Sequence, residues 1–368
     1  MKKKTISMMM AVALMLSMTG CGSSTKETTG SGNQEATTGQ ESTTVSEVQV
    51  EAVEQRTVYV TPEWVYSAMN GDQEGYEDVV VAEVGYGDVK DCVSYKEGHI
   101  PGAIYVDNCE VEDATGDEKG AYNLLDAEVV KDNLLSHGIT KDTKVILYGA
   151  DASGTARQAY GYLWVGVEDV KIVNGGIDAW KAAGYDTETK QNAGSEAGDF
   201  GTEVPACPQY WTSIEEAKER LENDDNFKLV SIRSEDEWLG KTSGYNYIDK
   251  AGEPEGAVWG KGAETAFDVA GFTNEDGTIK NLEGLQEVWS DCDFTLENDL
   301  AFYCGTGWRA SVPFLVLYEN GYDNVSVYDG GWYQWIMNED YPVQVGDPAD
   351  EDCQHVTVAD LPNDKAAK

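Results

Sequence analysis

Residues 170–180, VKIVNGGIDAW, and residues 325–335, VSVYDGGWYQW, are two copies of one pattern, and this pattern decides the fold. Each copy begins with an apolar run typical of a short buried strand, turns at a Gly-Gly pair, and continues into a segment that ends in tryptophan, which indicates a helix. Tyr148 and Tyr303 match at the same offset of 155 residues. This alternation predicts two α/β domains, each with a parallel sheet covered by helices.

The second copy carries a cysteine, Cys304, at the turn between an apolar strand at 299–303 and an apolar helix. Gly305 and Gly307 allow the turn to curl so that several backbone N–H groups point inward. With the N-terminus of the following helix, this turn predicts an anion-binding nest that favours a thiolate. Arg309 adds a positive charge, so we predict that Cys304 is a nucleophile. A buried strand-end cysteine without chemistry is the competing interpretation.

The run CGTGWR at 304–309 resembles the active-site loop of the rhodanese family of sulfurtransferases, in which a cysteine carries a persulfide sulfur. A second segment, YKEGHIPGAIYV at 95–106, resembles the other family signature, an aromatic residue shortly before His-Ile-Pro-Gly-Ala. The resemblance covers about residues 57–345. It implies two tandem rhodanese-like domains, each with a mostly parallel sheet covered by helices on both faces.

The resemblance also implies roles for the loop. Cys304 would take the outer sulfur from an anionic donor, thiosulfate or 3-mercaptopyruvate, and carry it as a persulfide. Cyanide, a small thiol or a reduced dithiol protein would then accept the sulfur. Arg309 would stabilise charge or orient the loop. The persulfide would be held by the loop residues Gly305, Thr306, Gly307 and Trp308. The loop lacks the cationic residues of many thiosulfate-using relatives, so the choice of donor stays open.

The first copy has Gly149 where the second has Cys304, and no cysteine falls in its loop. The first domain is therefore predicted to be catalytically silent. In the second copy, Arg233 ends a strand at a position that, in two-domain relatives, binds the anionic end of the donor. A surface arginine paired with Glu235 or Glu237 is the alternative.

The N-terminus predicts export as a lipoprotein. Three lysines precede an apolar run at 6–18, and MTGC at 18–21 is typical of a lipobox, so we expect Cys21 to be lipidated. A transmembrane helix is the alternative, but the apolar run is too short to span a bilayer. The expected organisation is a signal peptide (1–20), a disordered tether (21–56), domain 1 (57–190), a linker (191–208), domain 2 (209–345) and a C-terminal tail (346–368). The domains would lie outside the cytoplasm, held to the membrane only through the lipid.

The composition narrows the possible partners. The net charge of −41 argues against nucleic acid as a partner, because both would be negatively charged. We interpret this charge mainly as a contribution to solubility. The sequence has no Cys-x-x-Cys motif and no paired histidines, so neither a metal site nor another cofactor is expected. Five further cysteines leave the disulfide connectivity open: Cys92, Cys109, Cys207, Cys292 and Cys353.

Two other functions remain open. Phosphatase or arsenate-reductase chemistry occurs on the same fold, but those relatives have five residues between cysteine and arginine, whereas four separate Cys304 from Arg309. A non-catalytic sulfur-carrier or protein-docking module on the rhodanese scaffold is the second alternative.

Overall fold

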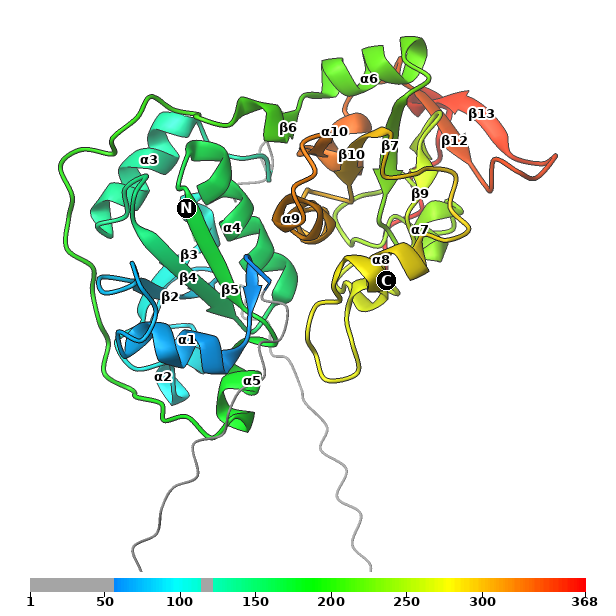
Figure 1. Ribbon diagram of the computed structural model, residues 1–368. Helices are drawn as coiled ribbons and strands as arrows, with labels where there is room; N and C mark the ends of the chain where they lie inside the picture. The colour runs from blue at the N-terminus through cyan, green and yellow to red at the C-terminus, as the bar shows by residue number, and fades with distance from the viewer. Residues whose placement is uncertain (1–55, 114–121) are drawn as a thin grey trace, which may run out of the picture. The chain divides into compact units, whose positions relative to one another are not determined.

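The computed structural model describes residues 56–113 and 122–368. The predicted signal peptide, Cys21 and the tether up to residue 55 lie outside the described residues. Within the described part, the predicted α/β fold class is confirmed, because two five-stranded sheets form and every neighbouring pair of strands in them is parallel. Helices connect the strands and cover them (Figure 1).

The first sheet has the strand order β1-β5-β4-β2-β3. Its strands are β1 (Tyr59–Val60), β2 (Val80–Gly85), β3 (Ile104–Asp107), β4 (Lys144–Gly149) and β5 (Asp169–Val173). The helices of this half are α1 (Pro62–Met69), α2 (Val93–Glu97), α3 (Ala127–Ser136), α4 (Ala152–Val165) and α5 (Gly176–Ala182).

Both faces of the first sheet are apolar. Successive side chains of a strand point to opposite sides of the sheet, and in β4 the side chains on both sides are buried. In β4, Ile146 and Tyr148 belong to a buried cluster that includes residues of α1 and α5. Val145 and Leu147 belong to a second cluster that includes residues of α3 and α4. The near-continuous apolar run of this strand is therefore explained by helices on both faces.

The second sheet has the order β6-β11-β10-β7-β9. Its strands are β6 (Trp211–Thr212), β7 (Phe227–Ser231), β9 (Val258–Trp259), β10 (Asp299–Tyr303) and β11 (Val325–Tyr328). The helices of this half are α6 (Ile214–Asn223), α7 (Glu235–Trp238), α8 (Leu282–Val288), α9 (Ser311–Glu319) and α10 (Gly331–Trp335). When the strands are numbered within each half, both sheets have the order 1-5-4-2-3, so the topology repeats as the sequence does.

A small antiparallel sheet, in the order β13-β12-β8, adjoins the second half. Its strands are β8 (Glu253–Pro254), β12 (Pro342–Val345) and β13 (Gln354–Thr357). Short 3-10 turns are η1 (Asn108–Glu110), η2 (Pro208–Tyr210), η3 (Ala270–Phe272) and η4 (Val358–Asp360). The segment set apart as a C-terminal tail thus contributes a strand, and its Lys365 carbonyl accepts a hydrogen bond of 2.8 Å from the Ser243 N–H.

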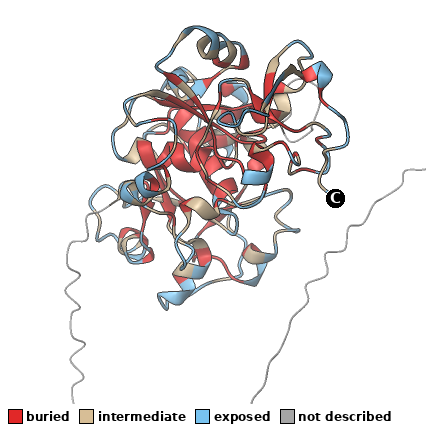
Figure 2. Ribbon diagram, turned by 90° about the vertical axis from the view of Figure 1, so that its right-hand side faces the viewer, coloured by how far each residue is buried: buried red, intermediate tan, exposed pale blue. Residues whose placement is uncertain are grey.

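Helices α4 and α9 lie side by side and join the two halves (Figure 1). The Tyr160 ring on α4 meets the Phe314 ring on α9 edge to face, with centroids 5.1 Å apart. Residues of both halves share one apolar cluster. Buried residues gather along the strands and the helices between them (Figure 2). The interface between the halves is therefore a continuation of the core.

Candidate active site

Cys304 directly follows β10, the central strand of the second sheet, at its carboxyl end. In open α/β sheets, ligands bind in the loops at this edge. Helix α9 begins only at Ser311, so residues 304–310 form a loop between strand and helix. The Cys304 side chain is 1% exposed and packs with the apolar cluster.

The loop carbonyls point toward the start of α10. The Trp332 N–H donates to the Cys304 carbonyl at 2.9 Å, and the Tyr333 N–H donates to the Gly305 carbonyl at 3.0 Å. A Cβ on Gly331 would lie 2.6 Å from both of these oxygens, so a side chain at this position would displace the loop. The turn that sequence analysis identified as Gly-Gly therefore serves as the support of the Cys304 loop.

The loop N–H groups have no protein partner within the described part of the chain. Among the described residues, the backbone N–H groups of residues 305–309 make no hydrogen bond. Gly307 has φ +88, which favours glycine, and a Cβ on Gly305 would lie 2.3 Å from the Tyr245 ring. Free N–H groups next to a cysteine form an anion cradle, which supports the predicted nest.

Arg309 is buried beside this cradle. Its NH1 and NH2 groups donate to the two Glu237 carboxylate oxygens at 3.1 and 3.0 Å, and NH1 also donates to the Thr265 carbonyl. Its Nε is buried and has no hydrogen-bond partner within the described part of the chain. Arg309 is close enough to Cys304 for their charges to interact. The guanidinium thus brings a fixed positive charge and an unused donor to the site.

Glu237 holds both arginines of the site. Its helix α7 begins with a capping box, in which Ser234 and Glu237 exchange hydrogen bonds. The Arg233 Nε donates to the same carboxylate at 3.1 Å. Burial by itself raises the pKa of Glu237, but the charges of Arg309 and Arg233 outweigh it and lower the pKa to about 2. Glu237 is therefore a permanent anion that neutralises part of the buried positive charge.

Arg233 occupies a different environment from either sequence-based interpretation. It is fully buried, and NH1 donates to the Gly252 carbonyl and to Glu253, each at 2.8 Å, while NH2 donates to Ser243 at 3.1 Å. It is not a surface residue, although its pairing with Glu237 was one of the alternatives. Protein acceptors bind all three of its nitrogens, and its contact with Glu237 links it to Arg309.

Trp308 connects the loop to the first half of the molecule. Its indole N–H donates to Glu112, which precedes the first gap in the described residues. Arg157 of α4 is fully buried between carboxylates: its Nε lies 3.2 Å from Glu112, and its NH1 lies 2.5 Å from Asp329. Asp329 directly precedes the Gly-Gly turn, and its carbonyl lies 2.7 Å from where a Cβ on Gly307 would be. The half whose β4 turn has no cysteine thus contacts both the loop, through Trp308, and the turn that supports it, through Asp329.

Two tyrosines, Tyr245 and Tyr247, pack beside the cysteine loop. The Tyr245 hydroxyl accepts a hydrogen bond of 3.0 Å from Arg309, and its ring lies against Gly305. Tyr247 is 43% exposed, and its ring centroid is 5.4 Å from that of Tyr245. Thr306, predicted to help hold the persulfide, is nearly buried in the loop. The structure therefore brings Cys304, Thr306, Trp308 and Arg309 together. Arg233 is connected to Arg309 through Glu237.

Sequence reasoning missed several residues that build this site. The missed residues are Glu112, Arg157, Glu237 as an active-site anion, Tyr245 and Asp329. Ser234 followed by Glu237 three residues later is a capping-box pattern, which would have placed Glu237 at a helix start. No local pattern marks Arg157 or Glu112, because their partners are distant in sequence.

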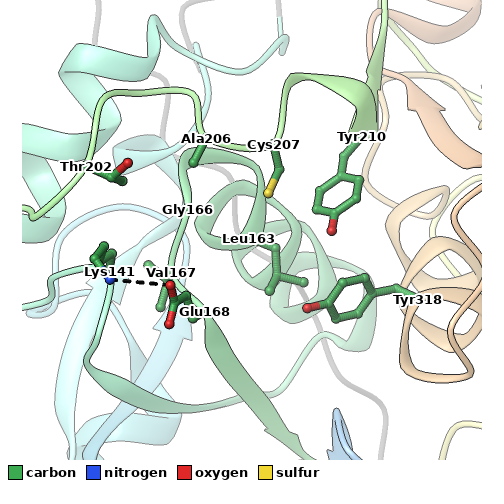
Figure 3. A pocket seen from close by; sticks show the side chains of 10 residues that line it. All are labelled: Lys141, Leu163, Gly166, Val167, Glu168, Thr202, Ala206, Cys207, Tyr210 and Tyr318. Carbon is green, nitrogen blue, oxygen red and sulfur yellow. Dashed lines mark hydrogen bonds and ion pairs between the residues drawn. The ribbon is translucent and has the colours of Figure 1, made fainter.

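Other features lie apart from the loop. A cavity of about 440 Å³ is bordered by Cys207, Tyr210 and Tyr318, and no residue of the Cys304 loop lines it (Figure 3). The structure, over its described ranges, has no helix long and apolar enough to cross a membrane and no acidic, histidine or cysteine cluster suited to a metal. In the same ranges the remaining cysteines are unpaired: Cys92, Cys109, Cys207, Cys292 and Cys353.

The rhodanese-like domain family matches residues 61–183 and again residues 213–338. The chain therefore belongs to the rhodanese family and contains two tandem rhodanese-like domains. Thiosulfate sulfurtransferase YnjE of Escherichia coli is 39% identical over 293 residues; the match covers 78% of this chain and 65% of that protein. A putative thiosulfate sulfurtransferase of Haloferax volcanii is 30% identical, with 78% of this chain and 96% of that protein covered.

Solved structures show the same likeness. The crystal structure of YnjE has a TM-score of 0.73 at 38% identity and covers 78% of this chain and 68% of its own. An anaerobic ergothioneine biosynthesis enzyme from Chlorobium limicola, in complex with its natural substrate trimethyl histidine, has a TM-score of 0.73 at 32% identity, with 79% and 71% covered. Other similar solved structures are those of the protein EanB. They include variants of a tyrosine that precedes the persulfide cysteine of that protein by 59 residues, and of a threonine that follows the cysteine by two.

Proposed function

We propose that this protein is a sulfurtransferase that moves a sulfane sulfur from thiosulfate or 3-mercaptopyruvate to a thiophilic acceptor through a persulfide on Cys304. The observation that carries the proposal is the row of N–H groups at residues 305–309, beside Cys304. Neither these groups nor the Nε of Arg309 has a hydrogen-bond partner among the residues that the structure describes. Such donors stabilise the anionic persulfide in a water-poor site. The YnjE relative, named for thiosulfate sulfur transfer, supports this assignment.

In the first half-reaction, the Cys304 thiolate attacks the outer sulfur of the donor. The bond between that sulfur and the rest of the donor breaks, and its electron pair leaves with sulfite, or with the pyruvate fragment, which then takes up a proton. Negative charge stays on the terminal sulfur of the new persulfide. The N–H groups of Gly305 to Arg309 hold that charge, and Arg309 adds a fixed cation that Glu237 keeps in place.

In the second half-reaction, a nucleophile attacks the terminal sulfur and the S–S bond breaks, which regenerates the Cys304 thiolate. Arg233 takes no part in either bond change. Because its donors bind Glu237, Glu253 and backbone carbonyls, we assign it to positioning Glu237 rather than to binding the donor.

A second acceptor class is favoured by a specific observation. Tyr245 precedes Cys304 by 59 residues and Thr306 follows it by two, the same spacings as the tyrosine and threonine varied in EanB. Tyr245 also lies against the loop and binds Arg309. Sulfur transfer to a small ring-bearing molecule, as in the complexes of EanB with hercynine, is therefore the alternative to cyanide or simple thiols.

Intact-protein mass spectrometry after incubation with each donor tests the proposal. We expect a gain of one sulfur atom with thiosulfate, 3-mercaptopyruvate or both, mapped to Cys304 and removed by cyanide. The Cys304→Ser protein is the matched control and should gain no sulfur. An unmodified Cys304 with both donors, or transferable sulfur on another cysteine, would overturn the assignment.

We further propose that the protein is a lipoprotein anchored outside the cytoplasm through Cys21. Support comes from the sequence: the lysines, the short apolar run and the MTGC boundary. In the producing bacterium, Cys21→Ser should release the protein from the membrane fraction without affecting sulfur transfer. Diacylglycerol on the Cys21→Ser protein, detected by mass spectrometry, would show that the lipobox interpretation is wrong.

A further inference from the structure

Three tyrosines from separate segments meet beside the cysteine loop. The ring centroids of Tyr122 and Tyr247 are 5.7 Å apart, those of Tyr122 and Tyr333 are 6.1 Å apart, and those of Tyr247 and Tyr333 are 5.6 Å apart. Tyr122 comes from the first domain and the other two from the second. All three rings are partly exposed. Tyr122, Tyr247 and Tyr333 form a cluster, the tyrosine triad.

Two members of the triad lie near the Cys304 loop. Tyr333 donates its backbone N–H to the Gly305 carbonyl, directly after Cys304. Burial raises the pKa of the Tyr247 phenol, and a charge on Cys304 contributes to that rise. Because both effects keep the phenol protonated, its ring has an uncharged, electron-rich face.

Tyr122 is held in a strained backbone conformation. Its φ is +66, which is uncommon for a residue with a large side chain. Its N–H donates to the Asp113 carbonyl at 2.8 Å, and its carbonyl accepts a 2.9 Å hydrogen bond from NH2 of Arg157. Arg157 is fully buried and is itself paired with Glu112 and Asp329. A buried ionic bridge therefore holds the backbone that carries this partly exposed ring, and such strain is typical of functional sites.

We propose that the tyrosine triad is an acceptor subsite, shared by both domains, that binds a thiol carrying a quaternary ammonium or similar cation. The proposal rests on the sulfurtransferase function proposed above. It assigns the first domain a direct contact with the acceptor, beyond its support of the loop.

The chemistry of the triad favours a cation. Aromatic faces carry negative charge density, so they attract cations within about 6 Å and repel anions. The N–H cradle and Arg309 would bind the anionic donor, whereas the triad offers an anion no favourable contact. The net charge of −41 also draws cations toward the protein. Donor and acceptor are thus recognised by opposite electrostatics on neighbouring surfaces.

The transfer step itself balances without any further reagent. The thiolate of the acceptor attacks the terminal sulfur of the Cys304 persulfide, and a new S–S bond forms as the old one breaks. The acceptor leaves as a persulfide anion, and Cys304 returns to its thiolate. The cation of the acceptor stays on the triad while its thiol reaches the loop.

Choline binding tests the subsite without depending on sulfur chemistry. Choline has the quaternary ammonium group but no thiol, and 3,3-dimethylbutan-1-ol is its uncharged counterpart. By calorimetry, we expect choline to bind the resting protein more tightly than the alcohol. Tyr122→Leu should weaken choline binding about 2- to 30-fold, whereas Tyr122→Phe, which keeps the ring, should retain most of it. Tyr66→Leu is the matched control, since Tyr66 is an exposed tyrosine that stacks on Tyr185 elsewhere in the first domain.

Thiol kinetics test the same subsite during transfer. Protein preloaded with persulfide is mixed with thiocholine, its uncharged analogue 3,3-dimethylbutane-1-thiol, or anionic 2-mercaptoethanesulfonate. Each rate is compared between wild type and Tyr122→Leu, so differences in intrinsic thiol reactivity cancel. We expect the loss for thiocholine to exceed the others by the factor seen for choline.

The outcomes separate this inference from the proposed function. Equal choline affinity in wild type and Tyr122→Leu would overturn the subsite, as would an equal loss for all three thiols. If Cys304 never carries sulfur but choline binding depends on Tyr122 as expected, the subsite stands and the sulfurtransferase assignment fails.

Discussion

The turns after β4 and β10 occupy the same position in the two halves, yet they differ in what their backbone offers. After β4, helix α4 starts at once, and the Asp151 side chain caps it by accepting from the Ser153 N–H at 2.9 Å. After β10, the helix starts later, and over the described ranges the N–H groups of residues 305–309 make no hydrogen bond. A helix start that satisfies itself has nothing to offer an anion, whereas the uncapped loop has several donors.

The two halves contribute different residues to one candidate site. A Cβ on Gly149 would lie 2.6 Å from the Thr155 hydroxyl and 2.8 Å from the Val84 carbonyl, so the first turn has no room for a cysteine. The same half instead supplies Arg157 and Glu112, which hold the loop of the other half. A copy without a cysteine at this turn can thus still contribute residues to the candidate active site.

The largest expected effect separates the two turns directly. Cys304→Ser should lower donor-dependent sulfur transfer by about 10²- to 10⁴-fold with the fold unchanged, because a serine hydroxyl cannot form a persulfide. Adding Gly149→Cys to this variant should restore nothing and should destabilise the first domain, since that position is crowded. Assays of sulfur transfer with circular dichroism check both. Recovery of turnover in the double variant would show that the turns are interchangeable.

Next in size is the loss of the buried anion between the arginines. Glu237→Gln leaves Arg233 and Arg309 without their shared countercharge, and breaking a buried ion pair costs about 3–5 kcal/mol. Denaturant unfolding should show this loss. Glu235→Gln, exposed on the same helix, is the control and should change the free energy of unfolding by less than about 0.5 kcal/mol. Similar small effects for both variants would mean that Glu237 does not support the site.

A smaller effect should appear in the pH dependence of stability. Burial raises the pKa of Glu112 to about 7, against the opposing charge of Arg157. A raised folded-state pKa contributes stability that is fully present below about pH 4.5 and is lost as pH rises through 7. Glu112→Gln removes this titration, so the fall in the free energy of unfolding between pH 5 and pH 8 should shrink, by at most about 3 kcal/mol.

The titratable groups whose charges interact with that of Glu112 are those of Arg157, Asp329, Cys109, Tyr86 and Tyr122. Burial also raises the pKa of Glu253 to about 7, so part of the pH dependence should survive in Glu112→Gln. Glu128→Gln, on an exposed carboxylate of the first domain, should leave the slope unchanged. Parallel pH profiles for wild type and Glu112→Gln would contradict this account.

The smallest expected effect concerns Arg233. Arg233→Lys keeps the charge but cannot reproduce hydrogen bonds to Glu237, Glu253 and two carbonyls, so we expect a stability loss of about 1–3 kcal/mol. Because Arg233 acts through Glu237, both half-reactions should slow by a similar factor, measured by persulfide formation and by its discharge with cyanide. A loss confined to persulfide formation would return Arg233 to donor binding.

Much of the fold followed from local pattern, because strand and helix periodicity and Gly-Gly turns act over a few residues. The repeat predicted the α/β class, and Cys304 at a strand end predicted the loop. The environment of Arg233 could not be derived in this way. Its partners Ser243 and Glu253 lie ten and twenty residues away across irregular backbone, so burial and pairing depend on how these segments pack.

The sequence by itself determined which copy carries the cysteine, the Gly-rich composition of its loop and the order of strands and helices, because each of these is a property of neighbouring residues. Tertiary structure alone decided that Glu112 and Arg157 of the first domain hold Trp308 and Asp329 of the second. These contacts join residues up to 196 positions apart. Their strength comes from the attraction of opposite charges in a buried, low-dielectric environment, which offsets the cost of burying them. No local sequence pattern encodes which buried charges will meet.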